Sequence, residues 1–349
     1  MTRLSPRRRL TEMIRRLEHA AAWVLVVLAW CAGLLGLVGP LLGGEDPGLR
    51  GPIGFASETV AALWLPGGML AAFVAVAVLV RRLWWPAAAL APVALVILIP
   101  ELWGRSWPLA ARLPELGPVL RVATVNLNHD NDEDPLMEES LRRIDADVLV
   151  LPEFTSAWAE RLESWFAGDY PHRWLAALTT HPGYYFEGLR LAVWSRLAPA
   201  GKHEVRHLGR FLSQIRVPLR WRGRAFALFG IHPRKPFPYV HYAGAWRHRQ
   251  ELLDWIRGER LPAVVAGDFN ASPRSAFLRR LRLLGLTNAS EAVHGHAPAT
   301  WHMRRPAPLR IAIDHVMLSD AFTAVGFELG PTTNSDHAPV VAELTWRQR

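Results

Sequence analysis

The stretch Ala263-Val264-Val265-Ala266-Gly267-Asp268-Phe269-Asn270-Ala271-Ser272-Pro273 places two polar side chains at the end of an apolar segment. Residues 263–266 indicate a short buried strand, and Gly267 permits a close approach of the backbone. Asp268 and Asn270 follow at a spacing of two residues, so their side chains point the same way. A carboxylate beside a carboxamide can hold a water and a phosphate oxygen together. A turn that caps the next helix is the alternative interpretation of so short a sequence.

Composition limits what the rest of the chain can be. With 349 residues the chain is long enough for one large domain or two ordinary ones. Lys and Arg exceed Asp and Glu by 40 to 31 overall, but only by 29 to 24 from residue 119 onward. That mild surplus does not by itself indicate a nucleic-acid groove. The single cysteine, Cys31, excludes a disulfide framework and thiolate-bound zinc.

Three uncharged apolar runs occupy most of the first hundred residues, at 20–44, 59–80 and 83–100. The first is longer than the roughly 20 residues needed to cross a hydrocarbon core. It is also longer than the roughly 7–15 apolar residues of a signal peptide. We therefore expect three transmembrane helices, the first of them an uncleaved anchor. A cleaved signal peptide and a buried helical hairpin of a soluble domain are the alternatives.

The distribution of arginines predicts how the chain is oriented in the membrane. Basic residues precede the first apolar run and separate the second from the third, at Arg81 and Arg82, whereas the loop at 45–58 is net acidic. The positive-inside rule then places both basic stretches in the cytoplasm. We expect a multi-pass protein of the cytoplasmic (inner) membrane with an extracytoplasmic C-terminal domain. Its expected parts are a basic cytoplasmic tail at 1–19, a three-helix membrane anchor at 20–103, a linker at 104–118 and the C-terminal domain at 119–349.

Apolar strand-like segments alternate with amphipathic ones from residue 119 onward, which indicates an α/β layered fold. Strands are predicted at 120–125, 147–152, 191–195, 225–231, 263–267, 311–318 and 340–344, and helices at 134–144, 242–257 and 274–284. Alone, each polar residue near a strand end has an ordinary explanation as a turn, a cap or a core histidine. Their common position indicates one site. These residues are Asn126, Glu153, His232, Asp268, Asn270, Asp314, Asp336 and His337.

The motifs around these residues resemble the endonuclease/exonuclease/phosphatase superfamily, which includes deoxyribonuclease I and exonuclease III. The matching segments are Thr124-Val125-Asn126, Leu151-Pro152-Glu153, Ile231-His232-Pro233, Gly267-Asp268-Phe269-Asn270, Ile313-Asp314-His315 and Ser335-Asp336-His337-Ala338-Pro339-Val340. The N-terminal part resembles a bacterial membrane-anchored branch of that superfamily. The resemblance implies a four-layer α/β sandwich, in which two packed mixed sheets are flanked by helices, preceded by three transmembrane helices.

The resemblance also implies a metal site. Glu153 would bind a divalent cation, with Asn126 and Asp336 beside it. Oxygen ligands without thiols suit Mg²⁺ or Mn²⁺. One departure from the family pattern is Pro152, which stands where a glutamine usually precedes the metal-binding glutamate.

The remaining site residues are expected to act on water and on the phosphoryl group. By the resemblance, Asp268 would position or deprotonate the attacking water, and Asn270 would hold that water or a phosphate oxygen. His337, oriented by Asp314, would contact the phosphoryl group, because a carboxylate partner favours the imidazolium that stabilises developing negative charge. His232 would be the acid for the leaving group.

These expectations combine into a membrane-anchored, divalent-metal-dependent phosphoester hydrolase that acts outside the cytoplasmic membrane on a lipid-linked or headgroup phosphate. Membrane lipids would then be its partners. An extracytoplasmic endonuclease or exonuclease is the alternative, and a non-catalytic scaffold is a further one. Arg234 and Lys235 directly follow His232 and are candidates to bind an anionic substrate, and Glu187 is a candidate to orient His232.

Overall fold

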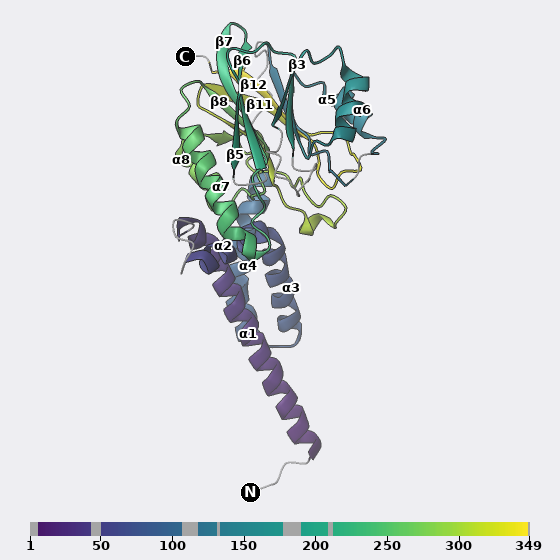
Figure 1. The fold of residues 1–349 in the computed structure, drawn as a ribbon. Helices are drawn as coiled ribbons and strands as arrows, with labels where there is room; N and C mark the ends of the chain where they lie inside the picture. Colours follow the sequence, from purple (N-terminus) through teal and green to yellow (C-terminus); the bar gives the residue numbers. More distant parts are fainter. Residues whose placement is uncertain are drawn as a thin grey trace.

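Two six-stranded sheets face each other in the C-terminal part of the chain (Figure 1). The computed structural model describes residues 6–42, 50–106, 118–130, 133–176, 190–208 and 212–347. The first sheet has the order β11 (Phe322–Leu329), β12 (Val340–Trp346), β1 (Leu120–Thr124), β2 (Val148–Pro152), β4 (Leu191–Ser195), β3 (His172–Ala176). The second has the order β5 (Glu204–Leu208), β6 (Leu212–Trp221), β7 (Arg224–Ile231), β8 (Ala263–Asp268), β10 (Asp314–Leu318), β9 (Thr287–Asn288).

The two sheets share one pairing pattern at their centres. In the first, β1 is parallel to β2, and antiparallel β12 and β4 flank this pair. In the second, β7 is parallel to β8, and antiparallel β6 and β10 flank it. Parallel strands end at the same edge of a sheet, so each pair delivers two loops to one place. The same arrangement of four strands thus occurs in both sheets, although the sequence shows no internal repeat.

The main core lies between the sheets and consists of aliphatic side chains from both. Val122 and Val150 of the first sheet and Leu228 and Val264 of the second are fully buried there. Outside the first sheet lie α5 (Met137–Ile144) and α6 (Ser156–Phe166). Outside the second lie α7 (Tyr239–Arg257) and α8 (Ala276–Leu283). A short helix, α9 (Ala289–His294), and a 3₁₀ turn, η2 (Ala307–Leu309), complete the domain. The predicted arrangement of two packed mixed sheets flanked by helices is confirmed.

The strands predicted from the sequence are present, with shifted ends. The largest shift is at β10, which was predicted from residue 311 but begins at Asp314. Its predicted first residues instead belong to a loop in which Ile311 bridges Trp301 and the Ile313 N–H donates to Thr300 Oγ1. The sequence did not predict β3, β5, β6, β9, β11, α6 or α9.

The described residues of the N-terminal part form four helices, and they differ from the expected three transmembrane helices. They are α1 (Pro6–Leu42), α2 (Arg50–Ala62), α3 (Trp64–Val80) and α4 (Trp84–Ser106). Among the described residues one helix, over Glu12–Leu35, is long and apolar enough to cross a membrane. The predicted second span is bent by 75° between Pro52–Ala62 and Gly67–Val80, so at most it adds one broken span. The apolar part of α4, Trp84–Ile99, is shorter than the length needed to cross.

Proline explains the bend in the second apolar run. Pro66 has no backbone N–H to donate to the Ala62 carbonyl, so the run of helical hydrogen bonds is interrupted and α2 ends at Ala62. The same proline is tolerated in the first turn of α3, where N–H groups have no helical partner. Two further boundaries differ from expectation. The predicted tail at 1–19 is helical from Pro6 onward, and α4 continues to Ser106, while the rest of the predicted linker, at 107–117, lies outside the described residues.

The helical part touches the C-terminal domain at one end. There α2 lies against α7, and α1 contacts α8 (Figure 1). From this contact α1 extends away from the sheets toward the N-terminus.

Candidate active site

Asn126 lies at the centre of a buried polar cluster formed where both parallel strand pairs end. It follows β1 and is 2 % exposed. Its Nδ2 donates to Glu153 Oε1 at 3.2 Å and to Asp268 Oδ2 at 3.3 Å, and lies 3.4 Å from His337 Nε2. Its Oδ1 accepts from the Asn128 N–H at 3.0 Å. Asn126 therefore ties the carboxylate of the first sheet to that of the second.

Glu153 is held in its ionised form by a residue that the sequence did not single out. Its backbone has a positive φ of 59°, which turns the chain sharply after β2. The Glu153 Oε2 accepts from the His129 N–H at 3.1 Å and lies 2.5 Å from His129 Nδ1. Although burial opposes ionisation, the hydrogen bonds from His129 and the nearby His232 lower the pKa of Glu153 to about 2. The loop after β1 supplies His129, and no motif marks it.

Asp268 ends β8, and its surroundings disfavour its ionised form. The side chain is 2 % exposed, and its Oδ1 accepts from the Asn270 N–H at 2.8 Å. Burial and the neighbouring Asp314 raise the pKa of Asp268 to about 8. Asn270 has a positive φ of 48°, and its Nδ2 donates to the Pro233 carbonyl at 3.1 Å. The Asn270 side chain thus joins the loop after β8 to the loop after β7.

His337 pairs with Asp314 across the two sheets. Its Nδ1 lies 2.9 Å from Asp314 Oδ2, and its Nε2 lies 4.0 Å from Asp268 Oδ2. Burial alone lowers the pKa of an imidazole, but Asp314 outweighs it and raises the pKa of His337 to about 10. The Thr300 hydroxyl accepts from the Asp314 N–H, and the Ser335 hydroxyl accepts from the His337 N–H. The predicted His337–Asp314 pair is present as a buried contact between the ring and the carboxyl group.

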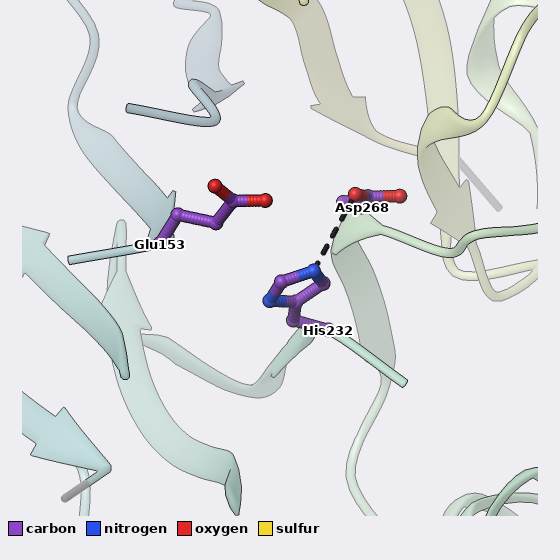
Figure 2. Close-up of side chains that lie close together, drawn as sticks. All are labelled: Glu153, His232 and Asp268. Atoms are coloured by element: carbon purple, nitrogen blue, oxygen red, sulfur yellow. Dashed lines mark ion pairs between the residues drawn. The ribbon is translucent and has the colours of Figure 1, made fainter. Parts of the chain in front are cut away.

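His232 is positioned by its backbone. Gln214 on β6 donates from Nε2 to the His232 carbonyl at 3.0 Å, and its Oε1 accepts from the His232 N–H at 2.5 Å. The His232 Nε2 lies 3.5 Å from Asp268 Oδ2 (Figure 2), and burial lowers the pKa of His232. Its Nδ1 is buried without a hydrogen-bond partner among the described residues. Gln214 could not be predicted from the sequence, because a glutamine inside a strand matches no motif.

Asp336 lies at the edge of the cluster. Its Oδ2 accepts from Trp301 Nε1 at 3.0 Å, and the Trp301 ring lies 6.4 Å from the His337 ring. Neither group of potential metal-binding side chains among the described residues includes Asp336. A direct bond from Asp336 to a cation stays a prediction, and Trp301 is a further residue that sequence reasoning missed. Glu187 lies outside the described residues.

Two overlapping groups in the cluster have ligand atoms close enough to share a cation. Glu153, His232 and Asp268 offer atoms within 4.8 Å of one another (Figure 2), and so do Asp268, Asp314 and His337. The second group contains His337, whose raised pKa favours its cationic form. The first combines Glu153, whose pKa is lowered, with Asp268, whose ionised form would be favoured by a cation close by. These residues fit a divalent cation bound chiefly by oxygen.

The sequence of the C-terminal domain matches the model of the Endonuclease/Exonuclease/phosphatase family over residues 123–337. The chain belongs to this family. The resemblance expected from its motifs is confirmed, and the chain is a metal-dependent phosphoric ester hydrolase. A search of the curated proteins finds no match.

Solved structures share the fold at low sequence identity. An endonuclease/exonuclease/phosphatase from Beutenbergia cavernae is 22% identical, with 65% of this chain and 72% of that chain covered and a TM-score of 0.53. One from Bacteroides vulgatus is 17% identical, with 66% and 100% covered and a TM-score of 0.53. TDP2 of D. rerio, solved with a single-strand DNA product, is 15% identical, with 65% and 99% covered and a TM-score of 0.51. The shared part is the sandwich.

Proposed function

We propose that this chain is a membrane-anchored, Mg²⁺-dependent hydrolase of lipid-linked or headgroup phosphoesters that works outside the cytoplasmic membrane. Glu153, with Asn126 and Asp336 beside it, would hold the cation, which when bound supplies positive charge to the phosphate oxygens. Carboxylate ligands and the lack of thiols favour Mg²⁺ or Mn²⁺.

The side chains around that position divide the work of hydrolysis. Asp268 orients the attacking water and accepts its proton, and its raised pKa makes it an effective base near neutral pH. His337, kept cationic by Asp314, donates a hydrogen bond to the phosphoryl oxygens as charge develops there. His232, whose Nε2 lies 3.5 Å from Asp268 Oδ2, would serve as the acid for the leaving group.

The segment from His232 into the first turn of α7 carries the argument for a membrane substrate. It leaves the active site through Arg234 and Lys235 and then exposes large apolar side chains, with Phe237 42%, Tyr239 48% and Val240 78% exposed. Exposed apolar residues gathered in one segment indicate contact with an apolar partner. Phe55 of the helical part lies against this segment, with its ring 4.9 Å from that of Phe237. This segment therefore connects the active site to the helical part and exposes side chains suited to lipid.

The outer surface of the helical part supports an anchor in lipid. Large apolar side chains on α1, α3 and α4 face outward, among them Leu34 at 55%, Phe73 at 70% and Trp85 at 77% exposed. Near the other end of the helices, Glu18 pairs with Arg81, so the two arginine-rich stretches lie on one side. The C-terminal domain contacts the opposite end, which supports the orientation expected from the positive-inside rule.

The experiment compares substrates for the full-length protein reconstituted in vesicles. We expect turnover of a polyprenyl diphosphate or a phospholipid in the same bilayer to exceed turnover of single-stranded or duplex DNA. A chelator should stop the reaction, and Mg²⁺ or Mn²⁺ should restore it. Nucleic acid is the rival substrate because the TDP2 neighbour was solved with a DNA product. Faster cleavage of DNA than of every lipid phosphate would replace the lipid proposal with a nuclease.

A matched pair of variants separates the membrane-facing segment from the chemistry. Val240→Ser should lower turnover of the lipid substrate about tenfold while leaving that of a soluble phosphodiester unchanged. Leu175→Ser, an exposed apolar residue on the edge strand β3, is the control and should leave both activities unchanged. Equal loss on both substrates in Val240→Ser would contradict a lipid-binding role for the segment.

A further inference from the structure

Glu58 is a buried acid in the helical part that contacts the catalytic domain. It lies on α2, and its side chain is 5% exposed. Its Oε1 accepts from the Ala276 N–H, the first residue of α8, at 3.1 Å, and its Oε2 lies 3.4 Å from Arg249 Nη1. A carboxylate at the first turn of a helix is favoured by the helix dipole. Glu58 therefore joins α2 to both helices that cover the second sheet.

Arg249 continues this connection to the active site. The Arg249 side chain on α7 is 0% exposed, and its guanidinium lies 5.5 Å from the Phe277 ring. Its Nη2 donates to the Asn270 carbonyl at 2.7 Å. Asn270 in turn donates its N–H to the Asp268 carboxylate. One chain of polar contacts thus runs from the helical part to the carboxylate that activates water.

The side chains of α2 and α7 around this series of polar contacts are closely packed. The Phe55 ring lies 5.2 Å from that of Tyr239 and 5.8 Å from that of Tyr242. A Cβ at Gly54 would collide with the Tyr242 hydroxyl. Burial and the charge of Glu58 raise the pKa of Tyr242 to about 12. The helix α2 approaches α7 so closely because residue 54 is a glycine.

We propose that Glu58 is a positioning residue of the active site, acting through Arg249 to hold the loop of Asp268 and Asn270 in place. The helical part is then a component of the catalytic unit as well as an anchor. Arg249 requires Glu58 as its partner, because a fully buried guanidinium is destabilised when its counter-charge is removed. The guanidinium would then move toward water and lose its hydrogen bond to the Asn270 carbonyl. The inference rests on the hydrolase activity of the family and does not depend on a lipid substrate.

The test measures kinetics and hydrogen exchange on the full-length protein in detergent micelles. Glu58→Gln keeps the volume and an acceptor for the Ala276 N–H but removes the charge. With bis(para-nitrophenyl) phosphate, a soluble phosphodiester, we expect kcat to fall at least tenfold and KM to change less than twofold. Amide exchange in the peptide covering 264–275 should become faster, and this readout is independent of the substrate chosen.

Controls separate positioning from general damage. Glu18→Gln makes the same chemical change at an acid that pairs with Arg81 within the helical part, and it should leave kcat and exchange unchanged. Adding Glu58→Gln to Arg249→Met should cause no further loss of kcat, because Glu58 acts through Arg249. Wild-type kcat and exchange in Glu58→Gln, or losses that multiply in the double variant, would overturn the proposal.

A second variant serves if Glu58→Gln fails to fold. Gly54→Leu pushes α2 away from Tyr242 without changing any charge, and it should lower kcat and speed exchange at 264–275 in the same way. Gly67→Leu is its control, because a Cβ there meets no atom within 4 Å. Unchanged kcat and exchange in Gly54→Leu would show that the helical part does not support the site.

Discussion

Asp268 is the residue whose charge state the rest of the site controls. Burial and Asp314 disfavour its ionisation and raise its pKa to about 8, whereas Asn126 and the Asn270 N–H donate to its oxygens. Without a cation beside it, the ionised carboxylate of Asp268 is therefore unfavourable. For the same reason it readily accepts a proton and can act as a base. The burial that raises the pKa of Asp268 makes it useful for catalysis, but burying its ionised form decreases the stability of the fold.

Asp268→Asn should remove activity and keep the fold. General base catalysis contributes about 10²–10⁴-fold, so kcat on a soluble phosphodiester should fall by at least about 100-fold. Because the amide replaces a buried charge that its surroundings disfavour, the Tm in chelator should not decrease. Steady-state kinetics and a thermal melt measure the two effects. A lower Tm with proportionate loss of activity would mean that Asp268 has a structural role instead.

Asp314→Asn should shift the pH dependence of activity. His337 is cationic below its pKa of about 10, and Asp314 is the main group that raises this pKa against the opposing effect of burial. Without the carboxylate, burial lowers the pKa of His337, so the alkaline limb of the kcat profile should move to lower pH. A pH–rate series from 6 to 11 in steps of about half a unit resolves such a shift. An unmoved alkaline limb would show that protonated His337 is not required.

At the scale of single elements, the approach of β7 to β8 depends on one glycine. Gly267 has a φ of 146°, and a Cβ there would collide with the Ile231 carbonyl on the neighbouring strand. Ile231 and Gly267 are register partners, and the residues that follow them are His232 and Asp268. This glycine sets how closely those two site residues approach.

Gly267→Ala should therefore destabilise the domain more than a glycine substitution in open space. The strained backbone costs about 1–3 kcal/mol, and separating the strands adds about 1–3 kcal/mol. Gly223→Ala is the matched control, because Gly223 also has a positive φ, of 76°, but a Cβ there meets no atom within 4 Å. Its cost should be limited to about 1–2 kcal/mol. Comparable decreases in Tm for the two variants would contradict the steric explanation.

Strand ends were the part of the site that the sequence could predict. Asn126, Glu153, His232 and Asp268 follow apolar strands in recognisable motifs, and the structure brings them together. Supporting residues could not be predicted, because their role depends on tertiary contacts between distant segments. Gln214 reaches His232 from the neighbouring strand, and Glu58 belongs to a loop in the sequence interpretation.

Strands that combine apolar residues with charged residues or proline could not be predicted from the sequence for a related reason. The strand β6 contains Arg216, Arg220 and Pro218, which interrupt an apolar pattern. Arg216 pairs with Glu259 beyond the sheet, and Pro218 lies opposite Ala227 in the ladder. Partners that satisfy these residues are distant in sequence, so local propensity alone argues against a strand here.

For the whole molecule, the proposed orientation in the membrane would determine which substrates the active site can meet. A reporter that is active only in the periplasm should work when fused after Arg349, and one fused near Arg82 should not. The physical reason is the arginine-rich ends on one side of the helices and the catalytic domain at the other. The reverse pattern of reporter activity would place the catalytic domain in the cytoplasm and make intracellular nucleic acid an available substrate.

Two key pairs of the active site bridge the two sheets. Asn126 of the first sheet meets Asp268 of the second, and His337, just before β12, meets Asp314 of β10. Sliding one sheet past the other by a single residue, about 3.3 Å, would break both pairs at once. The aliphatic core between the sheets could repack after such a slip, but the paired site residues would no longer meet. Catalytic activity therefore depends on the alignment of the two sheets. When the protein is gently denatured, loss of turnover should precede loss of secondary structure.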